Sequence, residues 1–109
     1  MQVNFEENSA TLKIGKDIYL RILQKAIAQT QQDVPELEKA LEANDFETIQ
    51  SISHRLKGDF DNLRITDLST VARAINENVK SDQDKEKITG LFEEFRKLFL
   101  ELEKIVQQQ

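Results

Sequence analysis

The sequence contains few of the residues that interrupt helices or that commonly carry catalytic chemistry. It has no cysteine, which excludes disulfides, thiolate metal sites and cysteine nucleophiles. Only one proline and three glycines occur in 109 residues, and nearly every segment has the apolar spacing of a helix. A single histidine is too few for a zinc site of the usual kind. These shortages predict an all-α protein in which no metal is bound.

Long apolar runs and a positive charge balance are also missing. No stretch approaches the roughly 20 apolar residues that a membrane-spanning helix needs, and residues 1–13 lack the apolar core of a signal peptide. The formal net charge of -5 argues against binding to a phosphate backbone. We therefore expect residues 1–109 to form a single cytoplasmic domain, a monomer that binds neither nucleic acid nor membrane.

The first half of the chain is expected to contain a short helix and a long helical stretch. The short helix should run from Phe5 to Ile14 and end at Gly15, and Asp17 can cap the next one. Asp33 is a second candidate cap, with Pro35 in a first-turn position, so the stretch after it is either a new helix or a kinked continuation. The apolar face expected before this break consists of Ile18, Ile22, Leu23, Ala26 and Ile27.

Three more helical segments follow, separated by polar breaks. Residues 44–45 begin the first of them, which should end near residues 63–64, and Asp67 can cap the second. A polar turn at residues 81–84 precedes the last segment. Its apolar residues recur at intervals of three and four: Ile88, Leu91, Phe92, Phe95, Leu98, Phe99, Leu102, Ile105 and Val106. Because the connections are short, we predict an up-and-down antiparallel four-helix bundle with a short extra N-terminal helix.

The only histidine, His54, lies on the polar face of one of these helices. The apolar stripe of this segment comprises Phe46, Ile49, Ile52, Leu56, Phe60 and Leu63. At 100° per residue, the centre of that stripe is about 140° from His54. Lys57, Gly58 and Asp61 share the side of His54, three, four and seven residues further along. A glycine inside a helix costs about 1 kcal/mol relative to alanine, so Gly58 suggests a functional need for a close approach.

The surroundings of His54 do not predict a stand-alone enzyme. Ser51 stands where a di-iron bundle has the glutamate of Glu-x-x-His. Asp61 lies about 10.5 Å along the helix axis, too far to orient the imidazole as in a serine hydrolase. Gln50 and Ser51 can hydrogen-bond one ring nitrogen and leave the other free as a nucleophile. We therefore expect a nucleophilic histidine that lacks the other parts of an active site.

The run His54-Arg55-Leu56-Lys57-Gly58 resembles the signature of the histidine-containing phosphotransfer (Hpt) domain, a phosphoacceptor histidine followed by x-Leu-Lys-Gly. Residues 37–45, the helical pattern and the chain length resemble the family as well. The resemblance implies that His54 accepts a phosphoryl group from a receiver-domain aspartate, or from a histidine kinase system, and passes it to another receiver. It implies that Lys57 balances the phosphoryl charge and that Gly58 permits docking. The partners implied are a response-regulator receiver domain and a sensor kinase, with magnesium bound by the receiver and no cofactor on this chain.

The sequence departs from the family pattern after Gly58. Asp59, Phe60 and Asp61 replace small residues, and Arg64 replaces a glycine. Phe60 falls on the apolar stripe and is expected to fill core, whereas Asp61 can form an ion pair with Lys57 one turn away. Acidic groups near the docking point can slow transfer or restrict which receivers fit. They leave open an alternative function, a module that docks or sequesters a receiver on the same face without being phosphorylated.

Overall fold

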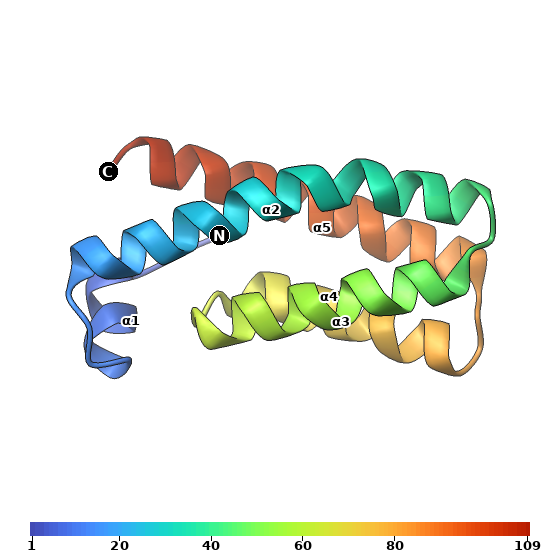
Figure 1. Cartoon of the computed structure of the whole chain (residues 1–109), viewed down its shortest axis with the longest axis horizontal. Helices are drawn as coiled ribbons and strands as arrows, with labels where there is room; N and C mark the ends of the chain where they lie inside the picture. Colours follow the sequence, from blue (N-terminus) through green and yellow to red (C-terminus); the bar gives the residue numbers. More distant parts are fainter.

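The computed structural model describes all 109 residues and contains five helices and no strand (Figure 1). The helices are α1 (Phe5–Thr11), α2 (Lys16–Glu42), α3 (Phe46–Asn62), α4 (Thr66–Lys80) and α5 (Lys85–Gln107). Each of the four long helices contacts the next, and α2 also contacts α5, which closes the bundle. The short α1 packs against α2 alone. The predicted four-helix bundle with an extra N-terminal helix is confirmed, and no helix is both long and apolar enough to cross a membrane.

The core consists of 23 buried apolar side chains contributed by every helix. Phe60 of α3 is fully buried, as its place on the apolar stripe predicted. Its ring lies edge-on to Phe95 of α5 with centroids 6.3 Å apart, and Phe95 stacks on Phe99 at the same spacing. These aromatic side chains bury large areas and so hold α3 and α5 in one core. Phe60 therefore connects the C-terminal part of α3 to α5 across the core.

Two acidic residues cap the helices that follow polar breaks. Asp45 accepts hydrogen bonds from the Thr48 amide at 3.2 Å and from the Thr48 hydroxyl at 2.6 Å, which together lower the pKa of its carboxyl below the usual value. Asp84 accepts a hydrogen bond from the Lys87 amide at 3.2 Å at the start of α5. Such bonds satisfy amides that have no partner inside the helix. The predicted start of α3 after residues 44–45 is confirmed.

Two other predicted caps are wrong. Gly15, not Asp17, occupies the N-cap position of α2, and Ile65, not Asp67, occupies that of α4. Both aspartates lie in the first turn instead, where a negative charge still interacts favourably with the helix dipole. A cap is defined by the backbone of the incoming chain, which the side-chain pattern alone does not specify. Similarly, α1 ends at Thr11 rather than at the predicted Ile14.

Helix α2 continues without interruption through the predicted break. Pro35 lies inside the helix, and Asp33 is a buried residue of its middle rather than a cap. Asp33 instead forms an ion pair with Arg55 of α3. Proline lacks an amide hydrogen, so its place in the helix leaves one carbonyl without its usual partner. Of the two interpretations left open by the sequence, continuation of the helix is correct.

Arg64, which stands where the family pattern has a glycine, follows the C-terminal end of α3. Arg64 has a φ of 61°, in the left-handed region. Its amide donates to the Asp61 carbonyl at 3.0 Å, and the Ile65 amide donates to the Phe60 carbonyl at 2.8 Å. This pair of bonds is the Schellman ending, in which glycine is the preferred left-handed residue. The chain therefore keeps the turn that follows α3 while carrying an arginine in a strained conformation.

The buried face of α2 differs in part from the predicted one. Leu23 and Ile27 are buried as expected, together with Tyr19, whose hydroxyl donates to the Leu63 carbonyl at 2.5 Å. Ile18 and Ile22, however, are 51% and 45% exposed. The first turns of α2 extend beyond the end of α3, with α1 beside them (Figure 1). Two large apolar side chains therefore remain on the surface.

Candidate functional site on α3

His54 is the middle residue of α3 and its side chain is exposed. Helix α3 packs between α2 and α4, and the residues on its inner side, Ile49, Ile52, Leu56 and Phe60, are buried. The helical pattern thus correctly predicted which side of α3 faces the core. An imidazole in this position is open to a macromolecular partner, and both of its nitrogens are free of protein hydrogen bonds.

A polar depression lies around the imidazole. It is lined by Glu47, Gln50, Ser51 and His54 of α3 and by Lys80 of α4, with no apolar residue among them. Gln50 and Ser51 make no hydrogen bond to the His54 ring, so the predicted orientation of the imidazole by these two residues is wrong for this structure. The depression holds one cation, one carboxylate and hydrogen-bonding groups near the histidine, and the cation is the group that favours an anion there. It can therefore accommodate a small anionic group.

Lys80 is a site residue that reading the sequence missed. It is the last residue of α4, and the fold brings it to the depression that contains His54. The available signal was the short connection between α3 and α4, which places Lys80 opposite residues 47–48 at the start of α3, and Glu47 lines the same depression. Lys80 adds a positive charge to one side of the imidazole. An ammonium is a suitable partner for a phosphoryl group.

Lys57, Gly58 and Asp61 continue the exposed face of α3 toward its C-terminus. Asp61 is exposed, and Lys57 and Gly58 are partly exposed. A Cβ atom built on Gly58 would meet nothing within 4 Å, so the surface is open there. The ion pair expected between Lys57 and Asp61 is not formed. Such a pair is worth only about 0.2–0.5 kcal/mol, which water and side-chain entropy readily offset.

A buried polar cluster supports α3 directly below this face. Asn76 of α4 donates to the Gln50 carbonyl at 3.0 Å and to the Ser53 hydroxyl at 3.1 Å. The Ser53 hydroxyl in turn donates to the Gln50 carbonyl at 3.2 Å. Ser53 and Asn76 are both buried, and buried polar groups need such partners. The cluster fixes the backbone next to His54 against α4. Its signal in the sequence was Ser53, a polar residue beside the apolar stripe of α3.

On the other flank, Arg55 connects α3 to α2. Its guanidinium pairs with Asp33, which is only 1% exposed, while the Arg55 side chain is 45% exposed. Gln29 also donates to Asp33, at 3.3 Å, but the second carboxylate oxygen of Asp33 has no partner. Burial raises the pKa of the nearby Asp59 carboxyl above its usual value; the Arg55 charge opposes this shift and the Asp33 charge adds to it. Arg55 thus pairs with one carboxylate, that of Asp33, and its charge also acts on a second one, that of Asp59.

Comparison with known families agrees with this geometry. The model of the Hpt domain matches residues 21–108. The chain belongs to the Hpt family. Members of this family are helical phosphocarrier modules of phosphorelays rather than catalysts, and they interact with receiver domains and kinases. No curated protein and no solved structure matches the chain.

The resemblance identified from the sequence is therefore confirmed over α2 to α5, the helices that carry and support His54. The structure brings together, in one depression, His54, Gln50 and Lys80. It leaves Lys57, Gly58 and Asp61 on the adjoining surface of α3. No group of three or more histidine, aspartate or glutamate side chains is close enough to hold a metal ion.

Proposed function

We propose that His54 is the phosphoacceptor of this Hpt protein. It accepts a phosphoryl group from the aspartyl phosphate of a receiver domain, or from a histidine kinase system, and passes it to a second receiver. The observation that supports this assignment most directly is the exposure of the only histidine at the middle of α3, within the Hpt motif. An imidazole nitrogen forms the new N–P bond while the acyl P–O bond breaks and the aspartate leaves as a carboxylate. This chemistry needs the imidazole to enter the partner's active site, which an exposed position allows.

The residues around His54 receive roles that follow from their charge and size. Lys57 and Lys80 balance the charge of the phosphoryl group, because Lys57 lies one turn of α3 from His54 and Lys80 lines the same depression as His54. Gly58 leaves room for the backbone of the receiver. Gln50 lines the depression and offers an amide to the phosphoryl oxygens. Asp61 lies further along the docking face and acts on the choice of partner rather than on the transfer.

In this proposal the partner supplies the rest of the reaction. The receiver binds magnesium and provides the acidic site, and this chain provides a positioned nucleophile and the flanking positive charge. Catalysis of phosphoryl transfer consists chiefly of positioning and of charge stabilisation, so two docked proteins can share it. We further propose that residues 1–109 act as one monomeric domain in the cytoplasm. Size-exclusion chromatography with light scattering tests the oligomeric state.

The test is transfer from a phosphorylated receiver in the presence of magnesium. Wild-type protein should acquire a label that is stable in alkali and labile in acid, as expected of phosphohistidine. His54→Gln should acquire none, and its free energy of unfolding should change by less than about 0.5 kcal/mol because the side chain is exposed. The chain has no second histidine that could take the label. Undiminished label in a folded His54→Gln protein would refute the assignment.

A second candidate function uses the same face without phosphorylation. Asp59 and Asp61 place negative charge beside Gly58, where the family usually has small residues. This charge repels the acidic phosphorylation site of a receiver and so disfavours transfer, which leaves docking or sequestering of a receiver as the function of the face. Binding that is retained by His54→Gln, together with no transfer of label from any receiver that binds, would select this alternative.

A further inference from the structure

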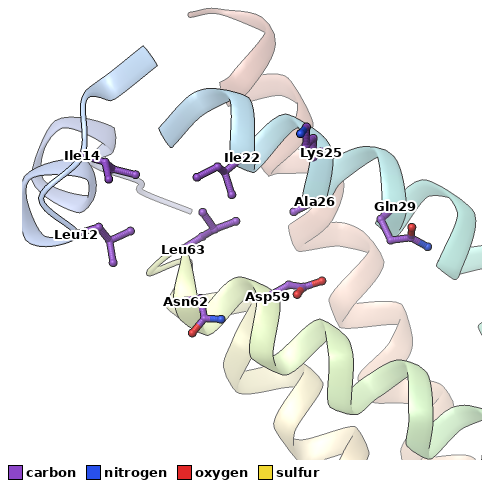
Figure 2. A pocket seen from close by; sticks show the side chains of 9 residues that line it. All are labelled: Leu12, Ile14, Ile22, Lys25, Ala26, Gln29, Asp59, Asn62 and Leu63. Atoms are coloured by element: carbon purple, nitrogen blue, oxygen red, sulfur yellow. The ribbon is translucent and has the colours of Figure 1, made fainter. Parts of the chain in front are cut away.

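A groove runs along α3 on the side that faces α2 (Figure 2). Its apolar end is formed by Leu12 and Ile14, which precede α2, and by Ile22 and Leu63. Its polar end carries Asp59 of α3 and Gln29 of α2, with Lys25 at the rim (Figure 2). The groove thus presents an apolar surface followed by a carboxylate. That arrangement fits a partner segment with an apolar side chain and a cation.

The groove is continuous with the face that carries His54. At 100° per residue, Gly58, Asn62 and Asp59 lie at about 40°, 80° and 140° from His54, all toward α2. Gly58 therefore lies between the histidine and the groove, and nothing lies within 4 Å of the position of its missing Cβ. Asn62 and Asp59 both line the groove. A protein that reaches His54 across Gly58 also covers the groove.

The charged groups at the polar end include a carboxylate that has no ion-pair partner. The guanidinium of Arg55 pairs with Asp33, and its charge also acts on the carboxylate of Asp59 without forming an ion pair with it. Neither Asp59 nor Lys25 belongs to any of the four ion pairs of the structure. Asp33 is buried and has one carboxylate oxygen without a partner, and its charge lies close enough to raise the pKa of Asp59 further. Lys25 lines the same groove but forms no ion pair with Asp59, so Asp59 is a half-buried carboxylate that a cation of a partner can reach.

We propose that Asp59 is a specificity-determining residue that receives a lysine or arginine side chain from the docked receiver domain, while an apolar side chain of that domain contacts Ile22 and Leu63. The proposal rests on the function assigned to His54 above. A receiver with a cation at this point gains a charge-assisted hydrogen bond in a partly desolvated groove. A receiver with a carboxylate there leaves two negative charges in contact and is rejected. Asp59 therefore selects among receivers without taking part in phosphoryl transfer itself.

The test compares Asp59 variants in binding to a receiver that exchanges phosphate with the wild-type protein. Asp59→Asn keeps the shape and removes the charge, and its dissociation constant should rise roughly fivefold to twentyfold, as expected for a contact between close charges. Asp59→Lys should weaken binding further. The matched control, Glu94→Gln, removes one negative charge from the exposed surface of α5 and should alter the dissociation constant less than twofold. Circular dichroism melting verifies that each variant is folded.

A charge exchange completes the test. Replacing the cation of the receiver by glutamate should weaken its binding to the wild-type protein and restore its binding to Asp59→Lys. Equal affinity of wild type and Asp59→Asn would overturn the proposal, and so would equal losses in Asp59→Asn and Glu94→Gln. Labelling by phosphoramidate, a small donor that needs no docking, separates the two assignments. Absence of phosphohistidine in the wild type refutes the function of His54, whereas its presence with unchanged affinities refutes only the role of Asp59.

Discussion

Gly58 is the position at which a requirement of folding and a requirement of docking can be separated by experiment. It lies inside α3, its φ is negative, and an added Cβ would meet nothing within 4 Å. The fold therefore gives no reason for glycine there. Alanine loses less backbone entropy on folding, so Gly58→Ala should raise the free energy of unfolding by about 0.5–1 kcal/mol.

Gly90 provides a matched control for this prediction. It lies inside α5, is exposed, and also has nothing within 4 Å of an added Cβ. Gly90→Ala should therefore stabilise the protein by a similar amount, about 0.5–1 kcal/mol, which corresponds to a rise in Tm of roughly 2–6 °C for a chain of this size. Urea unfolding followed by circular dichroism measures both variants under one condition. A loss of stability in Gly58→Ala would show that the glycine is structural.

The functional part of the prediction uses a longer side chain. Glutamine is a good helix former, so Gly58→Gln and Gly90→Gln should both be at least as stable as the wild type. Gly58→Gln, however, places a side chain between His54 and the groove. The rate of phosphotransfer from a receiver should fall at least tenfold in Gly58→Gln and change less than twofold in Gly90→Gln. Equal rates in the two variants would refute the argument that Gly58 is kept for docking.

Three further predictions concern the surroundings of the site. Arg55→Ala should lower the free energy of unfolding by about 2–3 kcal/mol, because it leaves the carboxylate of Asp33 buried without a cation. Asp33→Asn should lower it by only about 1 kcal/mol, because the half-exposed side chain of Arg55 can turn to water. Equal losses in urea unfolding would contradict this asymmetry. Arg64→Gly should stabilise the protein by about 1 kcal/mol by relieving the left-handed strain at the end of α3, and an unchanged midpoint in the same assay would argue against that strain. Burial raises the pKa of Tyr19, an effect opposed by its hydrogen bond from Asn8, so the single tyrosine should ionise above pH 10 when followed by absorbance. The unfolded chain then loses this proton first, and stability should fall as the pH rises beyond 10; a midpoint at 10 in the folded protein would contradict the burial.

Residues whose environment depends on one helix alone were predictable from the sequence. His54 was correctly placed on the outside of α3 and Phe60 in the core, because the angle between two side chains of a helix follows from their spacing. The polar break before α3 was also correct, since Asp45 caps the helix through the residue three positions later. Asp33 shows the limit of this reasoning. Asp33 is a good capping residue two positions before Pro35, so a helix start there was a reasonable prediction. In the structure Asp33 lies inside α2, where it pairs with the guanidinium of Arg55 from α3.

The sequence by itself determined the class of fold, the exposed histidine and the motif that places the chain in the Hpt family, because all three are encoded in the order of residues along single helices. Only the tertiary structure decided that Lys80 joins His54, that Ile18 and Ile22 stay on the surface, and that Asp59 ends a groove against α2. Each of these facts depends on the register and separation of two helices. That register is set by the packing of the whole core, in which many side chains from distant parts of the chain act together.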